Sequence, residues 1–284
     1  RYDAKTYGTV LLKGIIGDAR FSFPKSLYSV LDSLRFVVAD KPNALIIDFF
    51  AGSGTTLHAV NLLNAEDGGK RRCIMVTNNE VSAEEAKTLS DQGYVPGDPE
   101  WETLGIARYV TWPRTVCSIK GQNILGKPLT GDYGITEEEY VLDEESAVVS
   151  KKTGKPVKKN IYIKKKIQKA PALAEIKKAD GFQANAAFFK LGFLDKTKVS
   201  LGMQFKELLS TLWMKAGAIG KCPVIDASVP DMLILPNNKM AILNDENQFG
   251  EFAEQLTQHP EIDVVYLVTD YESSFVSMTQ ALDG

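Results

Sequence analysis

Residues 44–56 read ALIIDFFAGSGTT, and they decide the fold of the first part of the chain. The apolar start predicts a strand, and the stretch that follows, LHAVNLLNA (57–65), predicts a helix. A strand, a glycine-containing turn and a helix in this order form the first half of a nucleotide-binding βα unit, in which backbone N–H groups at the helix start face a ligand. Gly52 and Gly54 suit such a turn because glycine has no Cβ to obstruct a sharp bend or a nearby ligand.

Three kinds of ligand use a turn of this type, and the neighbouring residues distinguish them. A nucleoside triphosphate requires the lysine of the P-loop pattern, and Thr55 stands in that position. A dinucleotide favours a third small residue where this chain has Leu57. Asp48, at the end of the strand, disfavours both ligands because a carboxylate repels phosphate. It would attract a ligand that carries an ammonium and a sulfonium group, and S-adenosylmethionine has both.

Residues 48–56 resemble motif I of the DNA amino-methyltransferases, which methylate adenine N6 or cytosine N4. The similarity is strongest to the methylation subunits of type III restriction-modification systems, where an Asp is followed by Phe-Ala-Gly-Ser-Gly-Thr-Thr. FSFPKSLYSVLDSLRFV (21–37) resembles motif X, and RRCIMVTNNE (71–80) resembles motif II, a strand ending in an acid that binds ribose hydroxyls. The resemblance implies an S-adenosylmethionine site formed by Phe23, Pro24, Lys25, Asp48, Phe50, Ala51, Gly52, Ser53, Gly54, Thr55, Thr56 and Glu80.

The motif that carries catalysis in this family does not occur in the 284 residues. It reads Asp/Asn/Ser-Pro-Pro-Tyr/Phe, and it holds the target amine while its ring stacks on the flipped base. In the circular order typical of these enzymes it precedes motif X, so it would lie upstream of Arg1. We therefore expect the C-terminal fragment of a site-specific DNA methyltransferase, with adenine N6 the favoured target. The missing N-terminal half of the same protein would be its partner, and this chain alone would be inactive.

The composition predicts a cytoplasmic globular protein. Hydrophobic residues make up 44% of the chain, enough for one or two domains with their own cores. Its three cysteines are scattered without metal-ligand spacing, so no metal is expected. No apolar run reaches membrane-spanning length, so no membrane is expected either. The net charge of −3 gives no overall nucleic-acid signature, and any DNA contact must come from a local patch.

One lysine-rich patch exists at SAVVSKKTGKPVKKNIYIKKKIQKA (146–170), where β-branched runs on either side of TGKP predict a long hairpin with an exposed turn. An acidic segment, ITEEEYVLDEES (135–146), precedes it. Two interpretations stay equally open: a solvated arm whose acids and bases pair weakly, and an arm that runs along a DNA backbone. Contacts of the second kind position a protein without reading sequence, and they would come from Lys151, Lys152, Lys155, Lys158, Lys159, Lys164, Lys165 and Lys166.

Between motif II and the lysine-rich segment, PEWETLGIARYVTWPRTVCSIKG (99–121) predicts a helix that is kinked or broken at Pro113. The apolar spacing indicates that this helix packs on the sheet and leaves Arg108 and Arg114 as rim charges. His58 has no partner in the sequence, and we interpret it as an exposed residue on a helix face.

The pattern of residues 186–284 predicts a second small α/β domain. AAFFKLGFLD (186–195) alternates like a strand, and MQFKELLSTLWMKAG (203–217) predicts an amphipathic helix. DMLILP (231–236) and KMAILND (239–245) predict a hairpin. A helix, a buried strand and a closing helix follow.

The predicted fold class is α/β, with a partial Rossmann-like S-adenosylmethionine-dependent methyltransferase sheet plus a second small α/β domain. We expect the cofactor-binding half in residues 1–122, an acidic then lysine-rich hairpin arm in 123–185 and a C-terminal α/β domain in 186–284. Expected partners are DNA, a restriction subunit and a second copy of the chain, joined through the strand at 44–48. The alternative function is a non-catalytic DNA- or subunit-binding module of a restriction-modification complex. Leu57 and Asp48 disfavour a third class, a dinucleotide-dependent oxidoreductase.

Overall fold

The computed structural model describes residues 2–17, 21–143, 148–149, 156–157, 161–200, 202–225 and 228–282. The chain forms two compact units, Arg1–Phe189 and Lys190–Gly284. Both units mix helices with small sheets, so the α/β class is confirmed. The three functional segments 1–122, 123–185 and 186–284 remain predictions. Within the described ranges, no helix combines the length and apolar character needed to cross a membrane.

The first unit contains a parallel pair of strands, β1 (Leu45–Asp48) and β2 (Arg72–Met75). Parallel neighbours require a crossover connection, which α3 (Thr55–Asp67) provides. The other helical segments of this unit are Lys5–Val10 (π-helix), α1 (Leu11–Ile16), α2 (Leu27–Val38), α4 (Ala83–Asp91), α5 (Pro99–Thr103), Ala107–Thr111 (π-helix), α6 (Trp112–Lys120), α7 (Pro171–Ala174) and Lys178–Asp180 (3₁₀). The helix predicted over 99–121 is therefore three consecutive segments, and Pro113 lies in the first turn of the last one.

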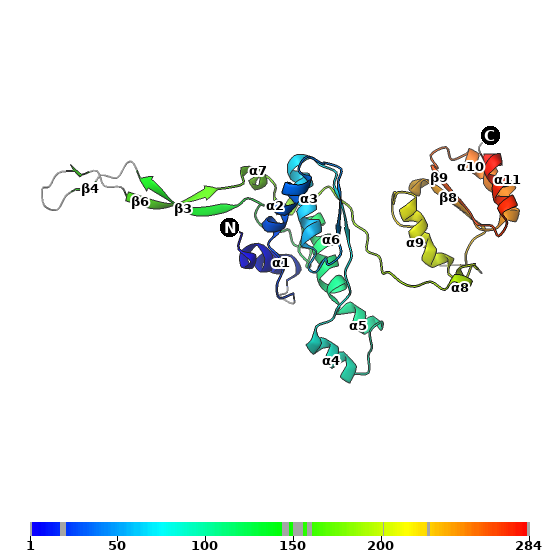
Figure 1. Ribbon diagram of the computed structural model, residues 1–284, viewed down its shortest axis with the longest axis horizontal. Helices are drawn as coiled ribbons and strands as arrows, with labels where there is room; N and C mark the ends of the chain where they lie inside the picture. Colours follow the sequence, from blue (N-terminus) through cyan, green and yellow to red (C-terminus); the bar gives the residue numbers. More distant parts are fainter. Residues whose placement is uncertain are drawn as a thin grey trace. The chain divides into compact units, whose positions relative to one another are not determined.

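Helices α2, α3 and α6 lie side by side in this unit (Figure 1). Six consecutive residues of α3, from His58 to Leu63, are buried, so this helix is covered on several faces. Leu62 and Leu63 of this helix pack with Leu27, Leu31 and Tyr28 of α2 in the main hydrophobic core. This packing fixes the start of α3, and with it the glycine turn that precedes the helix.

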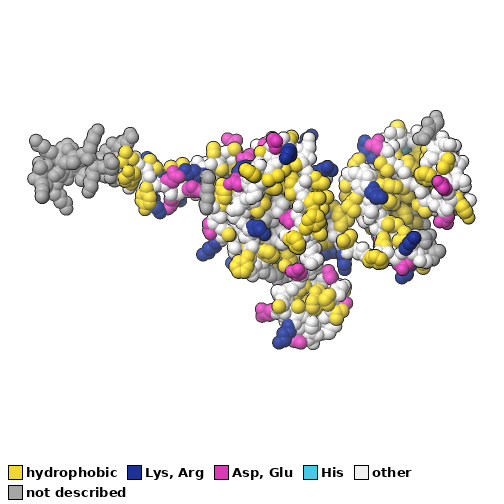
Figure 2. Space-filling view, viewed as in Figure 1, with side chains coloured by type: hydrophobic (Ala, Val, Ile, Leu, Met, Phe, Trp, Pro, Cys, Tyr) yellow, Lys and Arg dark blue, Asp and Glu magenta, His cyan; other side chains and the backbone are white. Residues whose placement is uncertain are grey.

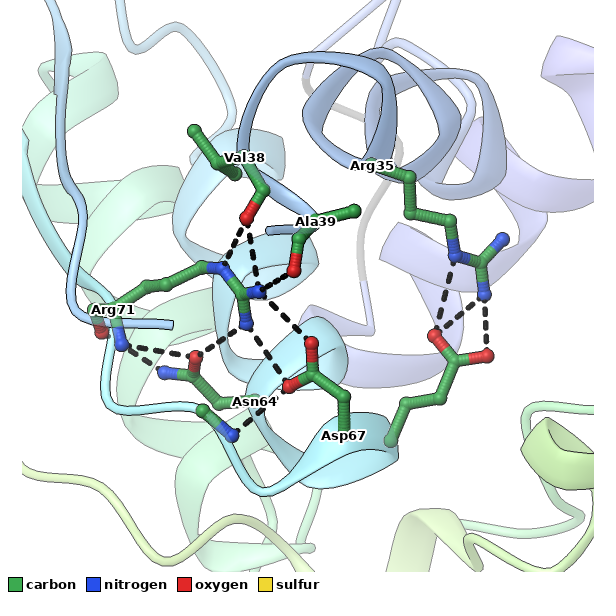
Figure 3. Close-up of polar contacts among 8 residues, drawn as sticks. Arg35, Val38, Ala39, Asn64, Asp67 and Arg71 are labelled. Carbon is green, nitrogen blue, oxygen red and sulfur yellow. Dashed lines mark hydrogen bonds and ion pairs between the residues drawn. The ribbon is translucent and has the colours of Figure 1, made fainter. Parts of the chain in front are cut away.

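Arg71 connects the ends of α2 and α3 to the start of β2 (Figure 3). Its guanidinium donates to the carbonyl oxygens of Val38 and Ala39, at 2.9 and 3.0 Å, where the last turn of α2 leaves acceptors unpaired. The same side chain forms an ion pair of 2.9 Å with Asp67, near the end of α3. Because the Arg71 side chain is completely buried, these contacts hold the two helices and the strand in one arrangement.

A two-stranded antiparallel ribbon is formed by β3 (Thr136–Asp143) and β6 (Ile161–Gln168). The short strands β4 (Val148–Val149) and β5 (Pro156–Val157) pair closer to the turn of the same hairpin. The sequence placed both limbs of the hairpin within 146–170. Instead, the acidic strand 136–143 is the partner of the lysine-rich strand 161–168, so the hairpin is longer than predicted and carries both charges.

The second unit is built around a three-stranded sheet with the order β7 (Met232–Leu235), β8 (Met240–Leu243) and β9 (Val264–Leu267). The predicted hairpin is confirmed, since β7 and β8 are antiparallel, and β9 runs parallel to β8. The helical segments are α8 (Lys196–Ser200), α9 (Phe205–Lys215), Pro236–Asn238 (3₁₀), Glu246–Gln248 (3₁₀), α10 (Phe249–Thr257) and α11 (Glu272–Leu282).

The central strand β8 is completely buried because helices cover both faces of the sheet (Figure 1). Met240 and Ile242 pack against α9, whereas Ala241 and Leu243 pack against α10 and α11. This alternation is the period-two pattern of a strand between two apolar layers. The strand predicted over 186–195 is wrong: the segment has no strand, and Leu191 and Phe193 are 95% and 97% exposed.

Candidate functional site

The turn between β1 and α3 requires glycine at two positions. Gly52 and Gly54 have φ angles of +49° and +75°, in the left-handed region that glycine adopts most readily. Space is also tight there. A Cβ on Gly52 would lie 3.3 Å from the ring of Phe21, and one on Gly54 would lie 3.2 Å from the methyl group of Thr111. The backbone therefore bends where the sequence predicted it, with neighbours packed closely behind it.

Asp48 organises the same turn from the end of β1. Its carboxylate accepts a hydrogen bond of 2.9 Å from the backbone N–H of Phe50 and one of 2.6 Å from the hydroxyl of Thr56. These two bonds tie the strand to the first turn of α3. The carboxylate is half-buried, so its charge remains close to the turn. The predicted role of Asp48, to complement a cationic ligand, remains a prediction.

Glu80 lies beside a cavity of about 150 Å³. Its backbone carbonyl accepts a 2.8 Å hydrogen bond from the N–H of Ile106, which anchors the segment before the second π-helix. Gly105 allows this close approach because any Cβ there would overlap the side chain of Asn79. The carboxylate of Glu80 is on an exposed residue at the rim of the cavity, which is lined by Glu80, Val81, Ser82, Glu85, Leu104, Ile106 and Val110.

Thr111 joins this cavity to the glycine turn. Its buried hydroxyl lies 2.6 Å from the carbonyl oxygen of Gly52 and 3.2 Å from that of Ile106. Ile106 in turn binds Glu80, so a short chain of contacts leads from the turn after β1 to the acid after β2. The sequence did not identify Thr111, because its partner lies 59 residues earlier in the chain.

The predicted residues of motif X have different environments. Pro24 is buried, and its carbonyl packs so closely against Gly8 that a Cβ there would lie 2.4 Å away. Phe23 is 89% exposed, and Lys25 is exposed as well. The aromatic ring next to the turn belongs instead to Phe21, a contact that the sequence analysis missed. The remaining turn residues, Ala51, Ser53 and Thr55, are buried, whereas Phe50 is 90% exposed.

Arg114 and His58 lie beneath the turn, and the predictions for both were wrong. Arg114 is completely buried rather than a rim charge, and it donates to Thr55 Oγ1 (2.8 Å), Ser53 Oγ (3.1 Å) and the carbonyl oxygen of Ser53 (3.3 Å). His58 is 2% exposed rather than solvated. Its Nε2 lies 2.8 Å from the hydroxyl of Tyr133, and its Nδ1 lies 3.5 Å from Arg114.

Burial determines the protonation of this pair. Desolvation lowers the pKa of Arg114 to about 10, so the guanidinium is still charged at neutral pH. Desolvation, with the positive charges of Arg114 and Lys178, holds the pKa of His58 well below its usual value. His58 is therefore neutral and can accept a hydrogen bond from Arg114. In the part of the chain that the structure describes, no carboxylate contacts this buried guanidinium.

An open groove of about 540 Å³ runs between α2 and β1. β2 pairs with one edge of β1, and no described strand pairs with the other. The side chain of Ile47 in this groove is 49% exposed, and hydrophobic side chains are visible over much of the surface of the first unit (Figure 2). Most of the lining is apolar: Val30, Ser33, Leu34, Val37, Val38, Leu45, Ile46, Ile47, Asp48, Phe49, Phe50 and Thr56.

Acidic residues face the lysines of the β3–β6 ribbon. Lys166 is opposite Glu138 in the strand register, and Lys164 forms an ion pair with Glu138. That contact is a hydrogen bond, and it lowers the pKa of the Glu138 carboxyl. Lys164, Lys165 and Lys166 are exposed on one strand. The other lysines predicted to contact DNA lie outside the described residues: Lys151, Lys152, Lys155, Lys158 and Lys159.

The described residues contain no group of three or more His, Cys, Asp or Glu side chains that could hold a metal ion. Cys73, Cys117 and Cys222 are free thiols. Desolvation raises the pKa of the Cys73 thiol, in β2, to about 12. A thiol of that kind is protonated at neutral pH and is a poor nucleophile. The cavity beside Glu80 combines carboxylates with apolar walls, a lining that suits a small molecule with polar and apolar parts.

No family model matches the chain. It is 46% identical over 65 residues to the type II methyltransferase M.KpnI of Klebsiella pneumoniae, a match that covers 23% of this chain and 15% of that protein. It is 40% identical over 73 residues to the EcoPI Mod subunit, a type III restriction-modification protein of Escherichia phage P1, with coverage of 26% and 11%. The StyLTI Mod subunit of Salmonella typhimurium, also a type III protein, is 46% identical over 63 residues, with coverage of 22% and 9%.

The matched stretches thus span about a tenth of the length of these relatives, between 9% and 15%. Within that span the identity is high, and all three relatives are methyltransferase or Mod proteins by name. The chain is partially homologous to the DNA methyltransferases of type II and type III restriction-modification systems.

Proposed function

We propose that this chain supplies the S-adenosylmethionine site of a site-specific DNA methyltransferase, with adenine N6 as the favoured target. One observation carries the proposal: Thr111 and Ile106 connect the Gly52–Gly54 turn to Glu80. A glycine turn after one parallel strand and an acid after the next are the two elements with which Rossmann-like sheets hold an adenosine ligand. The partial homology to restriction-modification methyltransferases indicates which adenosine ligand to test.

The residues of the site fit the parts of this cofactor. The carboxylate of Glu80 can accept hydrogen bonds from two ribose hydroxyls. Leu104, Ile106 and Val110 give the adjacent cavity apolar walls suited to a flat adenine ring. The first turn of α3 has backbone N–H groups without helical partners, which suit the amino-acid portion.

The other predicted residues surround these contacts in the proposal. Asp48 would face the cationic groups of the cofactor, and Phe50, Ala51, Gly52, Ser53, Gly54, Thr55 and Thr56 would form the turn beside its amino-acid end. Phe23, Pro24 and Lys25 would close one side. When bound, the cofactor would provide the methyl group, and this chain would bind and orient it.

Binding is tested by thermal unfolding of the purified chain with each of three ligands. S-adenosylmethionine and S-adenosylhomocysteine should raise the unfolding temperature, because a ligand that binds only the folded state stabilises it. NAD, at the same concentrations, should leave it unchanged. Stabilisation by NAD but not by the other two ligands would contradict the proposal and favour an oxidoreductase.

We also propose that methyl transfer needs a part of the protein that this chain does not contain. Its sequence has no Pro-Pro-aromatic tetrapeptide to polarise an exocyclic amine or stack a flipped base. The full-length protein would be the methyltransferase, and the N-terminal half would supply the catalytic motif. Incubation of the chain with labelled S-adenosylmethionine and duplex DNA should therefore transfer no label. Detectable transfer would show that catalytic residues exist within these 284 positions.

The ribbon favours a second candidate, a DNA- or subunit-binding module. Three consecutive lysines, Lys164–Lys166, are exposed there, and so are Tyr140 and Tyr162. Lysines can neutralise phosphates, whereas exposed aromatic residues on a mixed-charge ribbon suit a protein such as a restriction subunit. Duplex binding that weakens steeply with salt would favour DNA as the partner. Binding of a restriction subunit that is insensitive to salt would favour a protein partner instead.

A further inference from the structure

Arg114 is a buried cation next to the proposed cofactor site, and the described part of the chain provides it with no counter-charge. Its four acceptors are all neutral: two hydroxyls, one carbonyl and the ring of His58. Its Nε is buried and has no hydrogen-bond partner among the described residues. A buried charge is normally paired, because the loss of hydration is costly. The structure therefore contains an unbalanced positive charge directly behind the turn.

The position of this charge increases the imbalance. Thr55, which accepts a hydrogen bond from Arg114, is the first residue of α3. The N-terminus of a helix carries a partial positive charge of its own, so guanidinium and helix end repel each other. An anion on the open side of the turn would relieve both charges at once. In proteins, helix N-termini combined with a cationic side chain are a recurrent way of binding a carboxylate or phosphate.

Two adjacent threonines connect the turn to opposite charges. Thr55 accepts from the Arg114 guanidinium, whereas the hydroxyl of Thr56 donates to the Asp48 carboxylate. The start of α3 thus lies between a cation on one side and an anion on the other. This arrangement is complementary to a zwitterion, in which an ammonium and a carboxylate are attached to the same carbon. A phosphate would meet Arg114 favourably but Asp48 unfavourably.

We propose that Arg114 is a positioning residue for the α-carboxylate of the cofactor's amino-acid portion. This inference rests on the proposed function. Arg114 acts through Ser53 and Thr55: it holds their hydroxyls and the carbonyl of Ser53 in place and adds its positive potential to the first turn of α3. The site then recognises a complete amino acid, with Asp48 on the ammonium side, rather than any adenosine compound.

The test measures calorimetric binding of three ligands to the full chain. S-adenosylhomocysteine carries the ammonium and the carboxylate, S-adenosyl-3-thiopropylamine lacks only the carboxylate, and 5′-methylthioadenosine lacks both. The unaltered chain should bind S-adenosylhomocysteine at least tenfold more tightly than the decarboxylated ligand. Arg114→Gln should reduce that preference to threefold or less, and Arg114→Lys should retain most of it. Affinity for 5′-methylthioadenosine should be the same in all three proteins.

Arg71→Gln is the matched control, because it removes a guanidinium that is equally buried but that contacts Asp67 and the end of α2 instead (Figure 3). It should lower the unfolding temperature and leave the ligand preference unchanged. If Arg114→Gln weakens the binding of S-adenosylhomocysteine and of S-adenosyl-3-thiopropylamine equally, Arg114 only shapes the turn and the proposal is wrong. Equal affinities for the first two ligands in the unaltered chain would also overturn it, even if no variant folded. If none of the three ligands binds, the proposed function fails as well.

Discussion

Replacing Thr111 with valine removes the contact that joins the turn to the Glu80 segment. Valine has nearly the same shape as threonine, so the change leaves no cavity. It does remove the only hydroxyl that the described residues place against the carbonyl of Gly52, at 2.6 Å, in a position where Thr111 is 6% exposed. A partly buried acceptor left without a donor costs about 1 kcal/mol, the low end of the penalty for a buried group. For a unit of this size, that corresponds to a fall in unfolding temperature of roughly 2–4 °C.

Differential scanning calorimetry can follow the two units of the chain in one experiment. Thr115→Val is the matched control: Thr115 is 4% exposed, but its hydroxyl donates to a carbonyl one turn earlier in the same helical stretch. That carbonyl can still accept a helical bond, so the loss should be smaller. Thr111→Val should also weaken binding of S-adenosylhomocysteine, which Thr115→Val should not. A change of less than about 0.3 kcal/mol in stability for Thr111→Val would refute the reasoning.

Three further predictions concern other parts of the molecule. Burial lowers the pKa of His58 in the folded chain, whereas its pKa in the unfolded chain is near 6.5. Unfolding therefore takes up a proton below pH 6.5, and the free energy of unfolding should fall by up to about 1.4 kcal/mol for each unit that the pH decreases there. His58→Gln should remove this slope in urea titrations, and His259→Gln should not. One edge of β1 has no partner strand among the described residues, so we expect the chain to self-associate through it and Ile47→Lys to prevent this. Light scattering that gives a clean monomer of the unaltered chain at high concentration, with β1 protected from hydrogen exchange, contradicts the prediction. If the ribbon binds DNA, replacing Lys165 and Lys166 with alanine should reduce the salt slope of duplex binding by about two, and an unchanged slope would exclude these contacts.

Local patterns predicted the elements on which the site is built. The apolar run before Asp48 became β1, and the two glycines adopt the positive φ angles that the motif requires. The spacing of apolar residues also predicted α9 and the β7–β8 hairpin. These elements succeed because their residues interact with near neighbours in sequence, where periodicity and turn chemistry are informative.

Interactions between distant parts of the chain were not predictable in this way. Arg114 binds a turn that lies 59 to 61 residues earlier, and nothing in the sequence around it distinguishes a buried arginine from one at a rim. His58 was misread for the same reason, since Tyr133 is 75 residues away. The alternating apolar pattern of residues 186–195 also gave a wrong strand prediction. No described strand pairs with this segment, and it forms no strand.

The acidic segment before the lysines shows a third limit of sequence analysis. It was predicted to precede the hairpin, with weak pairing between its acids and the lysines, yet residues 136–143 form a strand that pairs with 161–168 along its whole length. Cross-strand attraction between glutamates and lysines supports this register. The predicted hairpin was limited to 146–170, because TGKP is the strongest local turn signal and lies in the lysine-rich part.

Titration of S-adenosylhomocysteine into the unaltered chain and into Glu80→Ala, followed by calorimetry, tests the central claim most directly. Loss of a charged acceptor for the ribose hydroxyls should cost on the order of 2 kcal/mol, or about a 30-fold weaker affinity. Glu84→Ala, an exposed acid outside the cavity lining in the same region, is the control and should bind normally. Equal affinities in the unaltered chain and Glu80→Ala would contradict the assignment of the cofactor to this site.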